Sequence, residues 1–67
     1  MRNPDRIYPF CNRLAAAWLE LSDWRFGQLM CNCLGDMAGN GRDPFFPEED
    51  EMIDYIEQYI ERVTGKS

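Results

Sequence analysis

Hydrophobic residues recur at helical spacing in three stretches of this chain, residues 4–21, 24–37 and 47–63. The middle stretch shows the pattern most clearly, because its large apolar residues repeat at intervals of three and four positions and so mark one helical face. They are Phe26, Leu29, Met30, Cys33, Leu34 and Met37. The stretch lies mid-chain, so segments on both sides of it can pack on this face. The pattern predicts an all-α fold, a compact three-helix domain that takes in residues 1–67 as a single unit.

Residues typical of helix ends separate these stretches. Ser22 or Asp23 is expected to cap the second helix, which leaves only a short connection to the first. Two helices joined in this way are expected to form a roughly antiparallel pair. Pro47 suits the first position of the third helix, whose acidic first turn complements the helix dipole, and Gly65 is the expected stop.

The start of the first helix carries a conflict. Asn3 is a favourable capping residue, directly before a proline that suits the first helical position. Pro9 then falls inside the helical pattern, although it lacks a backbone donor and its ring clashes with the preceding turn. The sequence therefore predicts a kink or a separate turn at the beginning of this helix.

Residues 39–47 form the one extended loop that the sequence predicts. It contains two glycines and two prolines, which break regular structure. Phe45 and Phe46 are more apolar than an ordinary loop requires, so we expect at least one of them to anchor the loop to the core.

The charge of the chain is unevenly distributed. The net charge is −5, with four arginines against three acids in residues 1–34 and nine acids against three basic residues in residues 35–67. An acidic chain is a poor general ligand for nucleic acids or anionic membranes, so neither is expected as a partner. The acidic half is interpreted as a solvated helix face.

The three cysteines and the absence of targeting segments favour a cytoplasmic protein. An odd number of cysteines argues against a disulfide framework, and Cys31 and Cys33 are too close on one helix to pair without strain. Cys33 lies on the apolar face, whereas Cys31 lies off it. The first ten residues lack the apolar core of a signal peptide, and no apolar run approaches the ~20 residues of a membrane span.

No arrangement of residues for catalysis emerges. The chain has no histidine, which excludes histidine-based triads and most zinc sites. The cysteine spacing matches no zinc or iron–sulfur pattern, and the acidic run at residues 48–54 lacks the loop geometry of an EF-hand. We therefore expect a protein without enzymatic activity, metal or cofactor.

One polar stripe stands out on the middle helix. Arg25, Gln28 and Asn32 align at helical spacing and offer planar hydrogen-bonding groups suited to an anion, a peptide backbone or a nucleobase. The alternative is a solvated helix face, although such a face more often carries Glu and Lys.

Three motifs in these regions, RNPDRI, DWRFGQLMCN and DPFF followed by EED, resemble a group of small uncharacterised proteins of bacteria and their phages. The resemblance spans most of the chain, and it implies a phage or mobile-element origin without implying an activity. Pro9 and the glycine-rich residues 39–41 depart from the pattern.

The first functional hypothesis is a non-enzymatic protein-interaction module that self-associates, since so small a core gives a thin margin of stability. Its contact surface is expected among aromatic residues that a domain of this size cannot bury, namely Trp18, Trp24, Phe45, Phe46 and Tyr55. One alternative is a small anionic-ligand binder, with nucleotide-like ligands held by Arg25, Gln28 and Asn32. Another is a phage inhibitor whose acidic third helix imitates nucleic acid toward a host protein.

Overall fold

The computed structural model describes residues 2–65 and folds them into three α-helices, without a strand in that range. The first helix is flanked by two 3-10 turns, so that together they cover the residues expected for it. The elements in chain order are η1 (Pro4–Arg6), α1 (Ile7–Trp18), η2 (Leu19–Leu21), α2 (Phe26–Gly39) and α3 (Glu49–Thr64). The predicted all-α, three-helix fold is confirmed.

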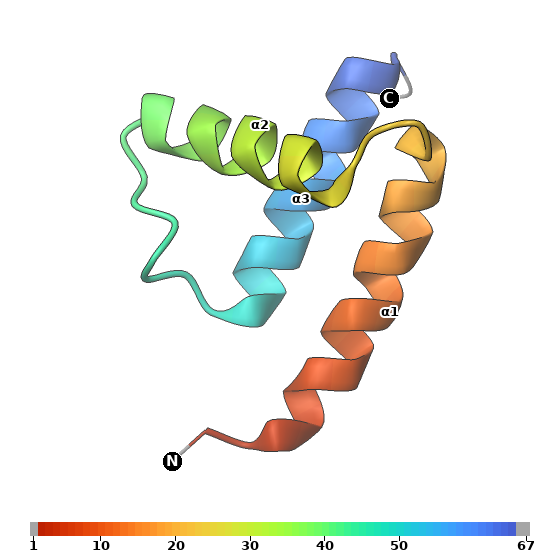
Figure 1. Ribbon diagram of the computed structural model, residues 1–67. Helices are drawn as coiled ribbons and strands as arrows, with labels where there is room; N and C mark the ends of the chain where they lie inside the picture. Colours follow the sequence, from red (N-terminus) through yellow and green to blue (C-terminus); the bar gives the residue numbers. More distant parts are fainter. Residues whose placement is uncertain (1, 66–67) are drawn as a thin grey trace.

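The helices α1 and α3 lie side by side and run in the same direction, while α2 crosses over them (Figure 1). The expected antiparallel pairing of the first two helices is therefore wrong.

The buried core comes from α2 and α3 alone. It consists of Leu29, Cys33, Met37, Ile53, Ile56 and Ile60, each at most 2% exposed. No residue of α1 is fully buried; Phe10, Leu14 and Trp18 are half-buried against this cluster. The helix α1 thus lies on a small core and keeps much of its own surface in water.

The helix ends differ from the expected ones by about one half-turn. Capping of α2 by Ser22 or Asp23 is wrong, because the N–H of Trp24 donates to the carbonyl of Leu21 at 2.9 Å and holds these residues in a turn. The N-cap is Arg25. Likewise α3 begins at Glu49, after the extended residue Glu48, rather than at Pro47.

Near the two ends of the chain, the structure agrees more closely with what the sequence predicts. The side chain of Asn3 accepts a hydrogen bond from the N–H of Asp5 at 2.9 Å, and the separate turn η1 precedes α1 as expected from Pro9. Pro9 lies in the first turn of α1, where a missing N–H leaves no hydrogen bond unmade. At the other end Gly65 adopts φ 77°, a left-handed conformation that suits glycine, and terminates α3.

Candidate interaction surfaces

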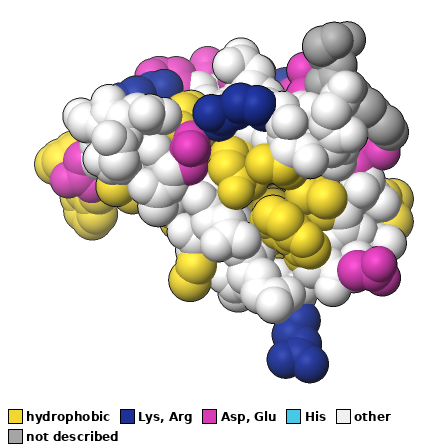
Figure 2. Space-filling model, turned by 90° about the horizontal axis from the view of Figure 1, so that it is seen from above, with side chains coloured by type: hydrophobic (Ala, Val, Ile, Leu, Met, Phe, Trp, Pro, Cys, Tyr) yellow, Lys and Arg dark blue, Asp and Glu magenta, His cyan; other side chains and the backbone are white. Residues whose placement is uncertain are grey.

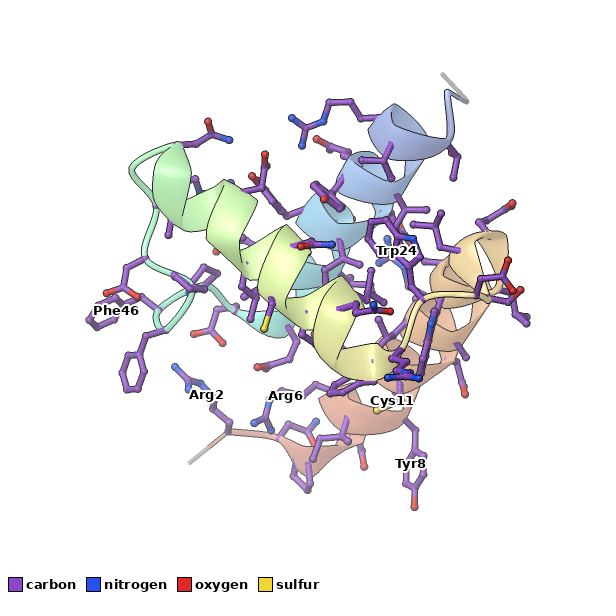
Figure 3. The ribbon with its side chains drawn as sticks, turned by 45° about the horizontal axis from the view of Figure 1, so that its top comes forward. Arg2, Arg6, Tyr8, Cys11, Trp24 and Phe46 are labelled. Atoms are coloured by element: carbon purple, nitrogen blue, oxygen red, sulfur yellow. The ribbon has the colours of Figure 1, made fainter. Side chains whose placement is uncertain are left out.

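The loop between α2 and α3 presents two aromatic rings to solvent. Phe45 is 83% exposed and Phe46 is 73% exposed, so the expectation that one of them anchors the loop is wrong. Their rings pack edge to face with centroids 5.1 Å apart. Figure 3 shows Phe46 directed away from the helices. We call residues 43–47 the aromatic loop.

Contacts at the base of the aromatic loop replace the expected aromatic anchor. The carboxylate of Asp43 accepts a hydrogen bond from the N–H of Phe45 at 2.9 Å, which fixes the turn. The guanidinium of Arg42 lies over the ring of Tyr55, 5.4 Å from its centroid, and 3.8 Å from the carboxylate of Glu51. Pro44 and Pro47 are half-buried. The two phenylalanines can therefore remain exposed on a loop whose backbone is held by other residues.

The polar stripe formed by Arg25, Gln28 and Asn32 is exposed, but its three side chains have different roles. The side-chain oxygen of Gln28 accepts a hydrogen bond from the backbone N–H of Arg25 at 2.8 Å. It thereby satisfies a donor at the start of the helix. The side chains of Arg25 and Asn32 make no hydrogen bond or ion pair within residues 2–65.

Asp36, which continues the same stripe, joins α2 to α3. Its carboxylate accepts hydrogen bonds from the hydroxyl of Tyr55 and, at 3.0 Å, from the guanidinium of Arg62. Asn40 donates to the same tyrosine oxygen at 3.1 Å. The hydrogen bond from Tyr55, followed by that from Arg62, lowers the pKa of Asp36 below its usual value. These contacts make this end of the stripe a structural link.

Trp24 belongs to the packed interior more than to an open surface. It is half-buried against the core, and Figure 3 shows it between α2 and the other two helices. Its carbonyl accepts a hydrogen bond from the indole N–H of Trp18 at 2.9 Å. Trp24 and Arg25 precede α2, whereas the aromatic loop follows it (Figure 1). The six predicted site residues therefore form two groups: four lie before α2 and in its first half, and the two phenylalanines lie beyond its C-terminal end.

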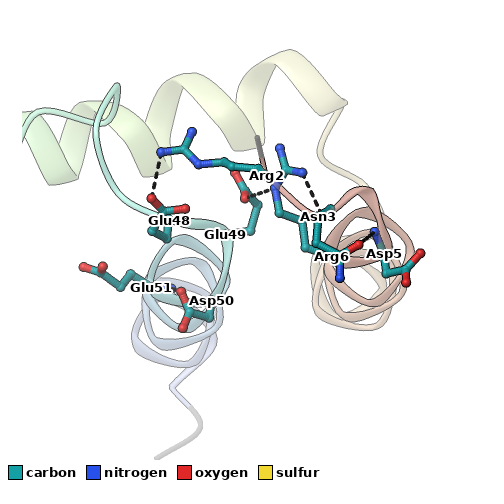
Figure 4. A network of polar contacts seen from close by, with 8 residues as sticks. All are labelled: Arg2, Asn3, Asp5, Arg6, Glu48, Glu49, Asp50 and Glu51. Carbon is teal, nitrogen blue, oxygen red and sulfur yellow. Dashed lines mark hydrogen bonds and ion pairs between the residues drawn. The ribbon is translucent and has the colours of Figure 1, made fainter.

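Most acidic residues at the start and along the length of α3 are exposed, as expected for a solvated face, and several of them also pair with arginines of the first segment. Figure 4 shows Arg2 bound to Glu48 at 2.8 Å and Arg6 bound to Glu49. Further along, Arg13 contacts Asp54 at 2.9 Å and also Glu57. The bond from Arg6 lowers the pKa of Glu49. The unequal charges of the two chain halves thus meet across the α1–α3 contact.

A third apolar area lies on the face that carries α2 and the C-terminal end of α3. Figure 2 shows hydrophobic side chains gathered in the middle of this face, with basic side chains beside them. The guanidinium of Arg62 lies 5.4 Å from the centroid of the Tyr59 ring, and Val63 is 45% exposed.

The cysteines separate into one buried and two exposed residues. Cys33 is fully buried, and burial raises the pKa of its thiol to about 11. Cys11 and Cys31 are exposed. Among residues 2–65 no group of three metal-ligating side chains is arranged to hold an ion, and none of the described helices is long and apolar enough to cross a membrane.

One set of exposed apolar residues, on α1 and at the start of η2, is not predicted by the sequence pattern. Ile7 is 47% exposed, Tyr8 80% and Leu19 74%. Figure 3 shows Tyr8 projecting away from the helices. The available signal was that hydrophobic residues of the first helix occupy more than one helical face, which a single buried stripe does not require.

Comparison with known proteins gives one partial similarity. The chain is 38% identical to part of a mitogen-activated protein kinase kinase kinase 1b from Physcomitrium patens over 73 aligned positions. The match covers 94% of the chain but spans only 9% of the length of that curated relative. No protein-family model and no solved structure matches the chain. The similarity therefore concerns a small segment of a much longer protein.

Proposed function

We propose that this chain is a non-enzymatic protein-interaction module that binds its partner through the aromatic loop. The observation that carries the proposal is the exposure of two adjacent phenylalanine rings, Phe45 and Phe46, which pack on each other rather than on the core. Exposed aromatic side chains contribute a large share of binding energy in protein interfaces. Neighbouring apolar side chains that remain exposed to water often mark an interaction site.

The way in which the loop is held also supports binding. The bond from the Phe45 N–H to Asp43 and the position of Arg42 over Tyr55 limit the conformations available to the loop before any partner arrives. A preformed loop loses less conformational entropy on binding than a free one. The similarity to a small segment of a longer protein is compatible with a module of this kind, and no kinase activity is proposed for the chain.

The test compares wild type with Phe45→Ser/Phe46→Ser as immobilised baits in an extract of the cells that naturally produce the chain. We expect the double variant to retain its helical circular dichroism and its melting temperature, since neither ring supports the core. Quantitative mass spectrometry should show that the double variant no longer captures the proteins that wild type captures. Val63→Ser, which removes an exposed apolar group elsewhere, should retain them. Equal capture by wild type and the double variant would overturn the proposal.

A second candidate, a small anionic-ligand binder, is favoured by one observation. Arg25 exposes a guanidinium without a carboxylate partner in the described residues, about two turns before the exposed side chain of Asn32 on the same face. Gln28, however, already serves the helix start and is not available without breaking that bond. A thermal-shift measurement with nucleotides separates the candidates, because a ligand that binds the folded state raises the melting temperature. No shift at millimolar nucleotide would remove the second candidate.

A further inference from the structure

One side of α1 is exposed over its whole length and carries no charge. We call it the outer face and define it by Tyr8, Cys11, Asn12 and Ala15 of α1 together with Leu19, the first residue of η2, which are all exposed. The arginines along this segment turn toward α3, where Arg6 and Arg13 bind carboxylates. A helix face in contact with water normally carries charged residues. The outer face is therefore better suited to contact with another apolar surface than to permanent exposure.

The outer face has a projection at one end and a depression at the other. Tyr8 is 80% exposed and projects from the first turn of α1. At the other end, Ala15, Trp18, Leu19 and Ser22 line an open hollow of about 340 Å³. Between the two ends lie only short side chains, which allow another helix to approach closely. Tyr8 and Leu19 are about 16 Å apart along the helix axis, at 1.5 Å per residue.

We propose that two copies of this chain pair through their outer faces, antiparallel and related by a twofold axis. Tyr8 of each copy then lies beside the partner's Leu19 and enters the hollow next to it, while Asn12 lies opposite the partner's Ala15. A projection and a hollow on the same face complement each other in two copies, as a twofold interface requires. This inference goes beyond the proposed function, because it concerns a surface that the aromatic loop does not share.

Charge favours a second copy as the occupant of this face. With a net charge of −5, two chains repel each other, and an uncharged face is where they can meet without apposing like charges. At the ends of the pair the charges are complementary. Arg25 adjoins Phe26, whose ring packs 5.7 Å from that of Trp18 at the hollow, and Asp5 lies one turn before Tyr8. Antiparallel pairing brings Arg25 toward the partner's Asp5, once at each end.

The first test is the mass of the protein in solution. The contact between one helix of each copy is smaller than the ~1,200–2,000 Å² of a stable complex, so we expect a dissociation constant in the micromolar range or above. Sedimentation equilibrium from about 10 µM to about 1 mM should show a transition from monomer to dimer. Leu19→Lys, at a largely exposed site, should raise the dissociation constant at least about tenfold, and Tyr8→Ser should act in the same direction. Phe45→Ser/Phe46→Ser is the matched control and should leave it unchanged.

The second test is the direction of pairing. In a background with Cys11→Ser and Cys31→Ser, the variants Asn12→Cys and Ala15→Cys are mixed and oxidised mildly. Antiparallel pairing predicts that the disulfide between residue 12 of one copy and residue 15 of the other forms faster than either disulfide between identical positions. Faster formation of the identical-position disulfides would overturn the arrangement.

The outcomes also separate this inference from the proposed function. A monomer at every concentration, or a dimer that depends on Phe45 and Phe46 but not on Tyr8 and Leu19, would overturn the pairing of outer faces. The proposed function would remain valid under both results if capture of a partner still depended on the aromatic loop. Loss of that dependence, with the dimer intact, would overturn only the proposed function.

Discussion

Single residues in this small domain lie in sharply different surroundings even when they are neighbours. Cys31 and Cys33 are two positions apart on α2, yet Cys31 is exposed and Cys33 is fully buried. The helical repeat turns one side chain toward solvent and the other toward Ile56 and the rest of the core. Burial also raises the pKa of Cys33 to about 11, so little of its reactive thiolate is present at neutral pH.

We expect a thiol reagent to label Cys31 quickly and Cys33 only as the fold opens. Labelling followed by peptide mass spectrometry, with and without denaturant, measures both rates in the same molecule. Cys11, which is exposed on α1, serves as an internal reference for an accessible thiol. Equal, rapid labelling of Cys31 and Cys33 in the native protein would contradict the observed helical phase.

At the scale of elements, the start of α2 shows how a residue that resembles a binding group can be a structural one. Gln28 lies on the exposed polar stripe, but its side chain accepts the N–H of Arg25 at 2.8 Å. That contact compensates for the absence of a Ser or Asp at the N-cap, a position that Arg25 occupies. The polar stripe therefore includes one residue that supports the helix and two whose side chains are available.

We expect Gln28→Ala to lower the free energy of unfolding by about 0.5–1.5 kcal/mol, the usual net contribution of one hydrogen bond. Asn32→Ala, on the same face without a bond to the described residues, should change it by no more than about 0.5 kcal/mol. Urea unfolding followed by circular dichroism measures both. Gln28→Glu keeps an acceptor near the helix N-terminus and should preserve stability. Equal effects of the two alanine substitutions would refute the capping role.

At the scale of the whole molecule, charged contacts join helices that share only a small core. Arg2, Arg6 and Arg13 bind acids at the start and along the length of α3, and Asp36 of α2 binds Arg62 near its end. These contacts are exposed, so each is worth little by itself. Together they fix which faces of the helices meet, and they make the fold sensitive to protonation of the acids.

Stability should therefore fall on acidification. The pKa values of Asp36 and Glu49 are lowered in the folded state, so each carboxylate stabilises the fold above its unfolded pKa, near 4, and this contribution is lost as the pH falls through the folded value. Melting temperatures between about pH 7 and pH 2 measure the loss. Asp36→Asn should lower stability at neutral pH and make the acid-induced decrease smaller. Asp23→Asn, in an exposed turn, is the control, and an unchanged pH profile for Asp36→Asn would contradict the assignment.

The sequence determined the three helices and most of the buried positions of α2 and α3, because helical periodicity is a local property of the chain; the apolar positions of α1 and Phe26 of α2 remain at least partly exposed. Leu29, Cys33 and Met37 on α2 and Ile53, Ile56 and Ile60 on α3 are buried as their spacing predicts. Local chemistry also predicted where the helical part of the chain begins and ends. Asn3 supplies the cap at its start, and Gly65 adopts the left-handed conformation that ends α3. These features depend on neighbours within one or two turns.

Only the tertiary structure decided how the helices cross and which apolar residues remain outside. The spacing around Phe45 and Phe46 carries no information on whether a core lies within reach, and both rings are exposed in the folded chain. The charges of Arg13 and Glu57 are 44 positions apart in sequence, and their pairing follows from the parallel contact of α1 with α3. That contact directs the arginines of α1 toward α3, and so it leaves Tyr8 and Leu19 on an uncharged outer face that periodicity alone did not reveal.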